Sequence, residues 1–194
     1  MRLLSLFLFF SLSSCGYHFQ RADEQRTLSI PYVKGDQEGQ LTNELIRQFA
    51  RSGAYTYLRE DGDLQLRVSL VGTTSEEIGF RYDRNQTTGA VETNLMPTEN
   101  RRTVTAEVSL VHAGTEEIFA GPYQISAAVD YDYTDVNSIQ ALAFVTPTGQ
   151  KEKVLNYSLG QVDSPEGAHD DATVPLYRNL AQQIVAAILH HLAS

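Results

Sequence analysis

Two stretches of strictly alternating hydrophobicity constrain the fold of this chain more than any other feature. Every second side chain is apolar in residues 64–70, and residues 104–110 repeat the pattern with Val104, Ala106, Val108 and Leu110. Runs of period two predict β-strands that bury one face and expose the other. Residues 118–131 alternate in the same way after a turn at Ala113-Gly114, with Pro122 marking a bulge. They are expected to return antiparallel, so the chain must contain a sheet with one covered face.

Two amphipathic helices are predicted to cover that face. Asp36 is expected to cap the first helix, which ends at Gly53, and Thr173 is expected to cap the last, with Pro175 in its first turn. The apolar stripe of the first helix consists of Leu41, Leu45, Ile46 and Phe49, and that of the last of Leu176, Leu180, Ile184, Val185, Ile188, Leu189 and Leu192. Helical spacing of these positions places each set on one side of its helix.

A further strand is predicted ahead of the first helix. Residues 27–33 alternate, with Leu28, Ile30 and Tyr32 on one face, and Pro31 places this strand at an edge or makes it leave the ladder early. Residues 54–58 form a short β-rich return. The sequence therefore predicts an α+β fold, in which two amphipathic helices pack on one face of a roughly four-stranded, mostly antiparallel sheet.

Two segments leave alternatives open. Residues 72–100 are polar and rich in Thr and Asn, and they form either a long functional or unstructured connection or an extension of a hairpin, since residues 78–82 have strand character. In residues 134–172, turns are expected at 147–149 and 164–167, and His169-Asp170-Asp171 is expected in a polar loop. Residues 139–145 are either a short helix or a strand, and residues 154–159 alternate weakly.

The N-terminus carries an anchoring signal. Arg2 precedes an apolar run, Leu3 to Leu12, that is shorter than the roughly 20 residues of a membrane-spanning helix and suits a signal peptide. The run ends in Leu12-Ser-Ser-Cys15, the lipobox pattern of bacterial lipoproteins, and Cys15 is the single cysteine. We expect residues 1–14 to be a lipoprotein signal peptide, 15–26 a lipidated tether and 27–194 one domain. Cys15 would carry a diacylglycerol and an N-acyl chain such as palmitate, with no other cofactor. Gly16, rather than Asp, favours passage to the outer membrane.

Composition and motifs argue against two classes of function. The formal net charge of −9 argues against generic binding to nucleic acid. No nucleophile motif, phosphate loop or zinc spacing is present. Asp130, Asp132 and Asp135 are read as a solvated strand face, and the adjacent His190 and His191 point to different sides of a helix. An enzyme and a metal site are therefore not expected.

One motif carries a resemblance to a known family. Cys15-Gly-Tyr-His-Phe19 resembles the mature N-terminus of the LptE family, the lipopolysaccharide-assembly lipoproteins of the Gram-negative envelope, and residues 30–33 and 172–185 are similar to that family's pattern. The resemblance implies an outer-membrane lipoprotein on the periplasmic side. It would plug the lumen of an LptD-type β-barrel, assist its assembly and bind lipopolysaccharide (LPS) in transit to the cell surface.

An acidic chain needs a local basic site to bind the phosphates of LPS. The candidates are Arg81, Arg84, Arg101 and Arg102, which cluster in an otherwise acidic sequence. An alternative function is a free, periplasm-facing auxiliary lipoprotein that binds or delivers a lipid or small ligand for an envelope transport system. That alternative predicts a sizeable apolar pocket between the helices and the sheet.

Overall fold

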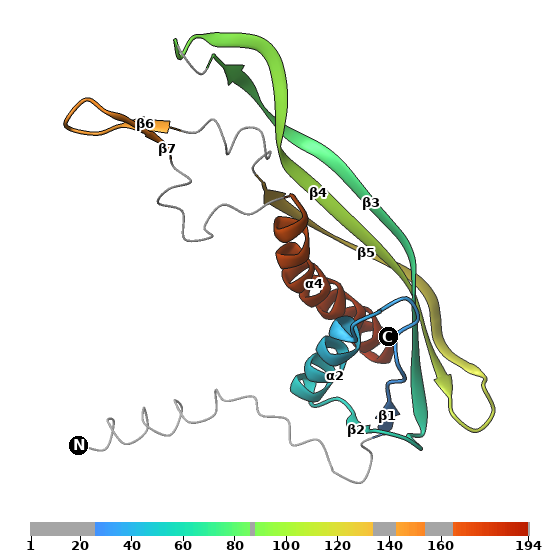
Figure 1. The fold of residues 1–194 in the computed structure, drawn as a ribbon. Coiled ribbons are helices and arrows are strands. Elements are labelled where there is room, and N and C mark those ends of the chain that lie inside the picture. The colour runs from blue at the N-terminus through green and yellow to red at the C-terminus, as the bar shows by residue number, and fades with distance from the viewer. Residues whose placement is uncertain (1–25, 86–87, 134–142, 154–164, 194) are drawn as a thin grey trace, which may run out of the picture.

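The computed structural model describes residues 26–85, 88–133, 143–153 and 165–193, which fold around one mixed sheet (Figure 1). The spatial order of its strands is β2-β1-β3-β4-β5. Their bounds are β1 (Thr27–Ser29), β2 (Thr56–Leu58), β3 (Leu64–Arg84), β4 (Val91–His112) and β5 (Ile118–Asp132). Two helices, α2 (Gln40–Ser52) and α4 (Pro165–Ala193), lie on one side of it. Strands β6 (Ala143–Val145) and β7 (Lys151–Lys153) form a separate hairpin.

The predicted α+β class is confirmed, but the sheet has five strands and mixed direction. β3, β4 and β5 form an antiparallel meander, whereas β1 runs parallel to both β2 and β3. The β1–β2 pair is parallel because α2 connects the two strands, and a helical crossover returns the chain in the same direction. The short return predicted at residues 54–58 is thus β2.

The segment at residues 72–100 is a hairpin extension, the second of the two alternatives. β3 and β4 stay paired from Leu64↔His112 to Arg84↔Val91, with shifts in register that mark bulges. β4 contains four threonines and β3 contains five β-branched residues, and such side chains fit a pleated surface better than a helix. The resulting two-stranded ribbon extends far beyond the helices (Figure 1).

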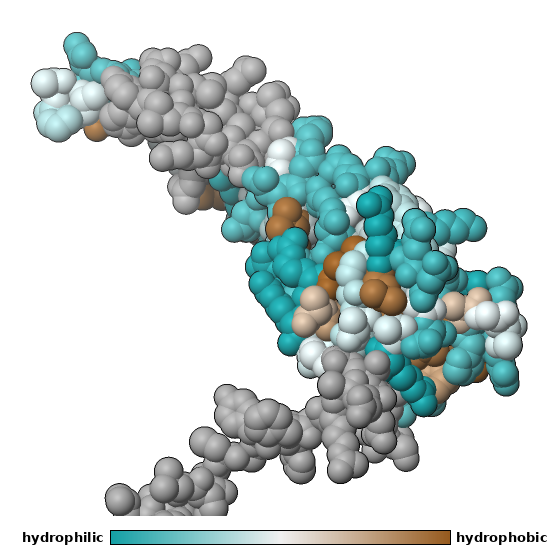
Figure 2. Space-filling view, turned by 90° about the horizontal axis from the view of Figure 1, so that it is seen from below, coloured by the Kyte–Doolittle hydropathy of each residue, from teal (hydrophilic) through white to brown (hydrophobic). Residues whose placement is uncertain are grey.

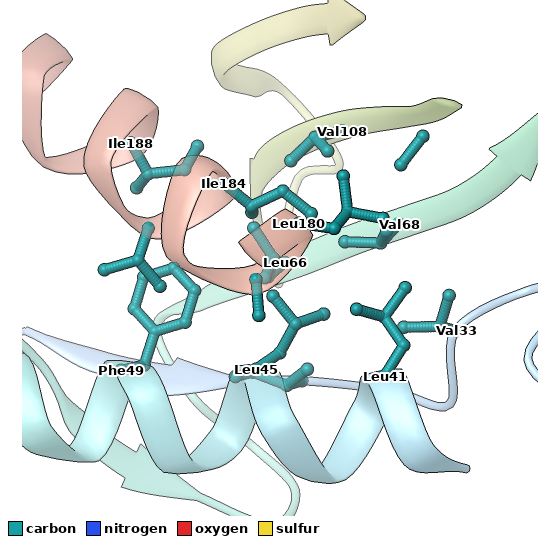
Figure 3. Packing of buried hydrophobic residues seen from close by; sticks show 14 of the residues in the cluster. Val33, Leu41, Leu45, Phe49, Leu66, Val68, Val108, Leu180, Ile184 and Ile188 are labelled. Atoms are coloured by element: carbon teal, nitrogen blue, oxygen red, sulfur yellow. The ribbon is translucent and has the colours of Figure 1, made fainter. Parts of the chain in front are cut away.

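The hydrophobic core lies between the two helices and the sheet. Figure 3 shows Leu45 and Phe49 of α2 and Ile184 of α4 pointing toward one another over the strands. The strands contribute the predicted alternating residues, of which Leu66 and Val108 are 1% and 0% exposed. Removing these side chains from water contributes about 25 cal/mol per Å² of apolar surface, which makes this layer the main source of stability.

Helix α2 is capped by Asp36, although not from the N-cap position. Gly39 occupies that position with φ of 70° and has no side chain to offer, so the chain turns there before Gln40 begins the helix. Asp36 Oδ2 accepts hydrogen bonds from both the backbone N–H and the hydroxyl of Thr42, each 2.8 Å long. The Thr42 hydroxyl oxygen in turn accepts from the N–H of Val33 at 3.1 Å. The helix ends at Gly53, as predicted.

Helix α4 corrects the prediction at its start. It begins at Pro165 rather than near Thr173, so Pro175 lies inside it, and residues 165–167 of the expected turn and the expected loop at His169 are helix. Thr173 does not cap: its hydroxyl donates to the carbonyl of His169. The buried side follows steps of four through Ala168, Ala172, Leu176, Leu180, Ile184 and Ile188. Ala168 and Ala172 are each only 5% exposed, so the first two turns of the helix also have a covered side, whereas the ring of Pro175 is exposed.

Tyr32 is a second correction. Its side chain is 61% exposed, whereas Val33 is buried in its place. The ladder of β1 ends at Ser29, ahead of Pro31, so the alternation of facing side chains no longer applies beyond that point. The expectation that Pro31 ends the strand early is confirmed.

Several predictions fall on or near the undescribed residues. The signal peptide, Cys15 and most of the tether lie outside the described residues, as do residues 154–159. Of residues 139–145, the described part is strand β6, and the predicted turn at 147–149 connects it to β7. Among the described residues no helix combines the length and the hydropathy needed to cross a membrane.

Candidate functional site

The structure does not bring the four predicted arginines into one cluster. Arg101 and Arg102 are neighbours in β4 and therefore project to opposite faces of the sheet. Arg81 lies in β3, five residues beyond Glu76, the partner of Arg101 across the ladder. At about 3.4 Å per residue, this separation amounts to roughly 17 Å. Arg84 is paired through its backbone with Val91, and its side chain lies outside the described set.

Arg101 faces away from the helices and is engaged by a carboxylate. Its Nε and Nη2 donate to the two oxygens of Asp130 at 2.7 and 2.8 Å, a bidentate pair across β4 and β5. The hydrogen bonds to Asp130 raise the pKa of Arg101, and nearby Glu76 and Glu99 raise it further. The same hydrogen bonds lower the pKa of Asp130. Asp130, which the sequence analysis assigned to a solvated strand face, is therefore the ion-pair partner of Arg101.

The face of the sheet around this pair is polar. Thr105 and Ser126 are hydrogen bonded across it at 2.8 Å. By alternation with the buried residues of β4 and the ladder partners, it also carries Thr74, Glu76, Glu99, Thr103, Glu107 and Gln124. In the view of Figure 2, hydrophilic residues likewise cover most of the described surface, and hydrophobic ones form small separate patches. The sheet therefore presents a hydrated surface on the side opposite its core.

Arg102 points to the helix side and is half-buried. Its Nη1 donates to the Thr173 hydroxyl oxygen at 2.6 Å, which links β4 to α4. Its Nε is buried and has no hydrogen-bond partner among the described residues. No carboxylate of the described chain forms an ion pair with this guanidinium.

A polar cleft of about 610 Å³ opens beside Arg102. It lies between β3, the N-terminal half of α4 and the loop that precedes α2; its lining includes Leu70–Thr73, Asp36, Glu38, Gln40, Arg102, His169, Asp170, Thr173 and Tyr177. Burial raises the pKa of Tyr177, and the nearby Asp36 carboxylate raises it further. Three carboxylates against one arginine make the cleft acidic, which disfavours an anionic ligand.

The far part of the β3–β4 ribbon combines a cation with exposed aromatic rings. Phe80 and Tyr82 are 53% and 59% exposed, and Arg81 lies between them in the strand. By strand alternation the two rings share one face and Arg81 takes the other. The two aromatic residues were not among the predicted site residues, but their spacing of two in a polar segment is a signal that the sequence contained. A ligand with both phosphates and acyl chains would therefore have to contact both faces of this narrow ribbon, Arg81 on one and the two rings on the other.

The described residues offer no metal centre. No group of three or more His, Cys, Asp or Glu side chains within them is arranged to hold an ion. His112 instead packs edge-to-face on Phe119, with ring centroids 5.4 Å apart, and His191 also packs edge-to-face on it at 6.1 Å. Arg26 covers the same ring at 4.8 Å. The ring of Phe119 in β5 thus contacts Arg26, His112 of β4 and His191 of α4.

Comparison with known proteins identifies one family. The sequence model of the LptE family, described as lipopolysaccharide-assembly, matches residues 25–188. No curated protein sequence matches the chain.

Among solved structures, a minor lipoprotein from Acinetobacter baumannii is 12% identical, with 84% of this chain and 91% of the other covered and a TM-score of 0.46. Rare lipoprotein B from Shewanella oneidensis is 17% identical, with 86% and 96% covered and a TM-score of 0.43. An uncharacterized lipoprotein B from Nitrosomonas europaea is 12% identical, with 87% and 88% covered and a TM-score of 0.42.

Proposed function

This chain belongs to the LptE family of lipopolysaccharide-assembly proteins, and from that premise we propose that it plugs an LptD-type β-barrel and binds LPS there. Cys15 would carry the diacylglycerol and N-acyl chains that hold it at the periplasmic side of the outer membrane. Two or more acyl chains anchor a protein stably, because each buried methylene contributes about 0.8 kcal/mol. The family's part in LPS assembly is not enzymatic, so no catalytic residue is proposed.

The match over residues 25–188 is the observation that carries this function. The polar sheet face around Arg101 supports the plug, because the lumen of a large membrane barrel is itself polar. The packed core counts against the alternative of a free lipid carrier. Leu45, Leu66 and Ile184 fill the space between helices and sheet with 0–1% exposure, where that alternative requires a ligand-sized pocket.

For LPS we propose the far part of the ribbon as the binding region. Arg81 and Arg84 would bind phosphate, and Phe80 and Tyr82 would contact acyl chains. Arg101 and Arg102 remain candidates from the sequence, but their contacts with Asp130 and Thr173 give both a structural role. Reversing their charge would therefore test folding and binding together.

The test is a double substitution, Arg81→Glu/Arg84→Glu, in the full-length lipoprotein. Loss of two charge-assisted contacts should weaken binding of purified LPS by about tenfold or more, because each is worth about 1.5–3 kcal/mol. Arg59→Glu is a control at the opposite end of the domain, since Arg59 is exposed in the turn before β3. An equal loss of LPS affinity in the control, or unchanged LPS binding in the double variant, would show that the ribbon is not the LPS-binding region.

Barrel plugging is tested separately in native membranes. A photo-crosslinking amino acid at the exposed Gln124, on the polar sheet face, should capture a large outer-membrane β-barrel protein. Purified chain should retain that barrel through detergent extraction. If no barrel is captured from native membranes, the proposed plug is wrong, whatever the outcome for LPS.

A further inference from the structure

One edge of the sheet is left open within the described part of the chain. The loop after β1 pairs with β3 at a single parallel bridge between Lys34 and Ser69. In this bridge Lys34 N–H donates to the carbonyl of Val68 at 3.1 Å, and Leu70 N–H donates to the carbonyl of Lys34 at 2.9 Å. At Gly35, with φ of 91°, the loop turns away. From Val71 onward, β4 is the only strand among the described residues that pairs with β3.

The residues that follow this bridge, Val71–Ser75, are called the open edge below. All five are exposed, and Val71 is 52% exposed. The open edge contains no charged residue and no proline, which are the usual protections against pairing with another chain. A bulge marks its first residue, but the ladder from Gly72↔Thr105 to Glu77↔Asn100 is free of shifts. Its backbone is thus a regular template for a further strand.

The acidic cleft lies along the open edge, because Leu70–Thr73 form one of its walls. Two buried polar atoms without a partner among the described residues belong to residues that line it, Arg102 Nε and Gln40 Oε1. The first is a donor and the second an acceptor. Both atoms are buried, so they are unsatisfied polar groups of the residues around the cleft and are not counted as contacts of its occupant.

The charged residues around the cleft indicate that its ligand is positively charged. Glu38 and Asp170 are exposed at its rim, and Glu77 follows the open edge on the same strand. Arg102 is the single arginine or lysine in the lining. This arrangement disfavours an acidic peptide or a phosphate and favours lysine or arginine side chains.

We propose that an extended basic peptide segment of a partner protein adds to β3 along the open edge and fills the acidic cleft. Backbone hydrogen bonds to β3 would provide affinity, as in other cases of strand addition to a sheet edge. Lysine or arginine side chains of the segment would meet Glu38 and Asp170. This surface lies on the helix side of the sheet and is separate from the ribbon residues proposed for LPS.

The test uses the full-length protein in detergent micelles and three synthetic peptides. One alternates Lys and Val, one alternates Glu and Val, and one has the Lys content of the first with Pro in place of Val. The Lys-Val peptide should slow amide hydrogen exchange at residues 71–75. The Glu-Val peptide should bind at least about tenfold more weakly, a difference of roughly 1.4 kcal/mol. The Lys-Pro peptide should give no protection, because proline has no N–H to donate to the ladder.

Two double variants define the site further. Glu38→Lys/Asp170→Lys should weaken binding of the Lys-Val peptide by about tenfold or more. The control, Glu60→Lys/Glu117→Lys, changes the net charge by the same amount in exposed turns outside the cleft and should leave binding unchanged. Equal binding of the Lys-Pro peptide, or protection confined to β5, would overturn the proposal. Concentration-dependent protection of residues 71–75 without peptide would also overturn it, because the occupant would then be a second copy of the chain.

Discussion

Replacing Asp36 by Ala should destabilise the domain far more than a typical acidic substitution. The Asp36 side chain is 1% exposed, and one of its oxygens accepts both hydrogen bonds from Thr42. The substitution would leave the N–H of Thr42 without a cap at the first turn of α2. The Thr42 hydroxyl would lose its acceptor as well, while it still accepts from Val33.

The magnitude follows from these contacts. Hydrogen bonds to a charged group contribute about 1.5–3 kcal/mol each, and loss of a helix cap costs about 0.5–2 kcal/mol. Because the two bonds share one oxygen and the site can relax, we expect a total loss of about 3 kcal/mol. For a domain of this size that corresponds to a fall in Tm of roughly 6–12 °C. Asp36→Asn keeps an acceptor without the charge and should lose about half as much.

Urea unfolding followed by circular dichroism measures this change, with Glu60→Ala as an exposed control expected within about 0.5 kcal/mol of the parent. Thr42→Val removes the partner hydroxyl, and combining it with Asp36→Ala gives a double-mutant cycle. Since the residues are in contact, their effects should be non-additive by about 1 kcal/mol or more. A loss below about 1 kcal/mol for Asp36→Ala, or strictly additive effects, would refute the capping role.

Three further predictions test other parts of the fold. Pro175→Ala should raise the free energy of unfolding in urea by about 1–3 kcal/mol, because a proline inside a helix removes a hydrogen bond; a neutral result would instead place Pro175 in the first turn. Gly62→Ala should lower Tm, since a Cβ there would lie 2.6 Å from the backbone nitrogen of Ser29, whereas Gly114→Ala has open space and should not. Asp130→Asn should lower Tm at pH 7, and the difference from the parent should shrink as the pH falls below the ordinary range of an aspartate. The pKa of Asp130 is lowered in the folded state, so its contribution is present above the unfolded pKa and is lost as pH falls through the folded one.

The core of the fold could be predicted from local patterns. The alternation at residues 104–110 and the stripe that includes Leu45 and Phe49 identified side chains that are buried in the structure. These patterns are reliable because period two and helical spacing place apolar residues on one face, and that face must leave water. Gly53 could be placed as the helix end for the same local reason, its left-handed backbone.

The candidate site could be predicted only in part. Sequence proximity grouped Arg101 with Arg102, but a strand turns neighbours to opposite faces, and the partner of Arg101 is Asp130, 29 residues later in the chain. The open edge of β3 had no sequence signal either, because it depends on where the loop at Gly35 leaves the sheet. Both features result from pairings between distant segments.

What the sequence determined by itself was the α+β class, the buried face of each main element and the resemblance to the family; the anchoring signal that ends at Cys15 stays a prediction. What the tertiary structure decided was the extent of the elements. Residues 72–84 are strand because residues 91–105 pair with them, and α4 extends N-terminal to Pro175 through a turn in which Ala168 and Ala172 are buried. The physical reason is that composition and spacing act locally, whereas long-range pairing and burial can outweigh a polar composition or a single proline.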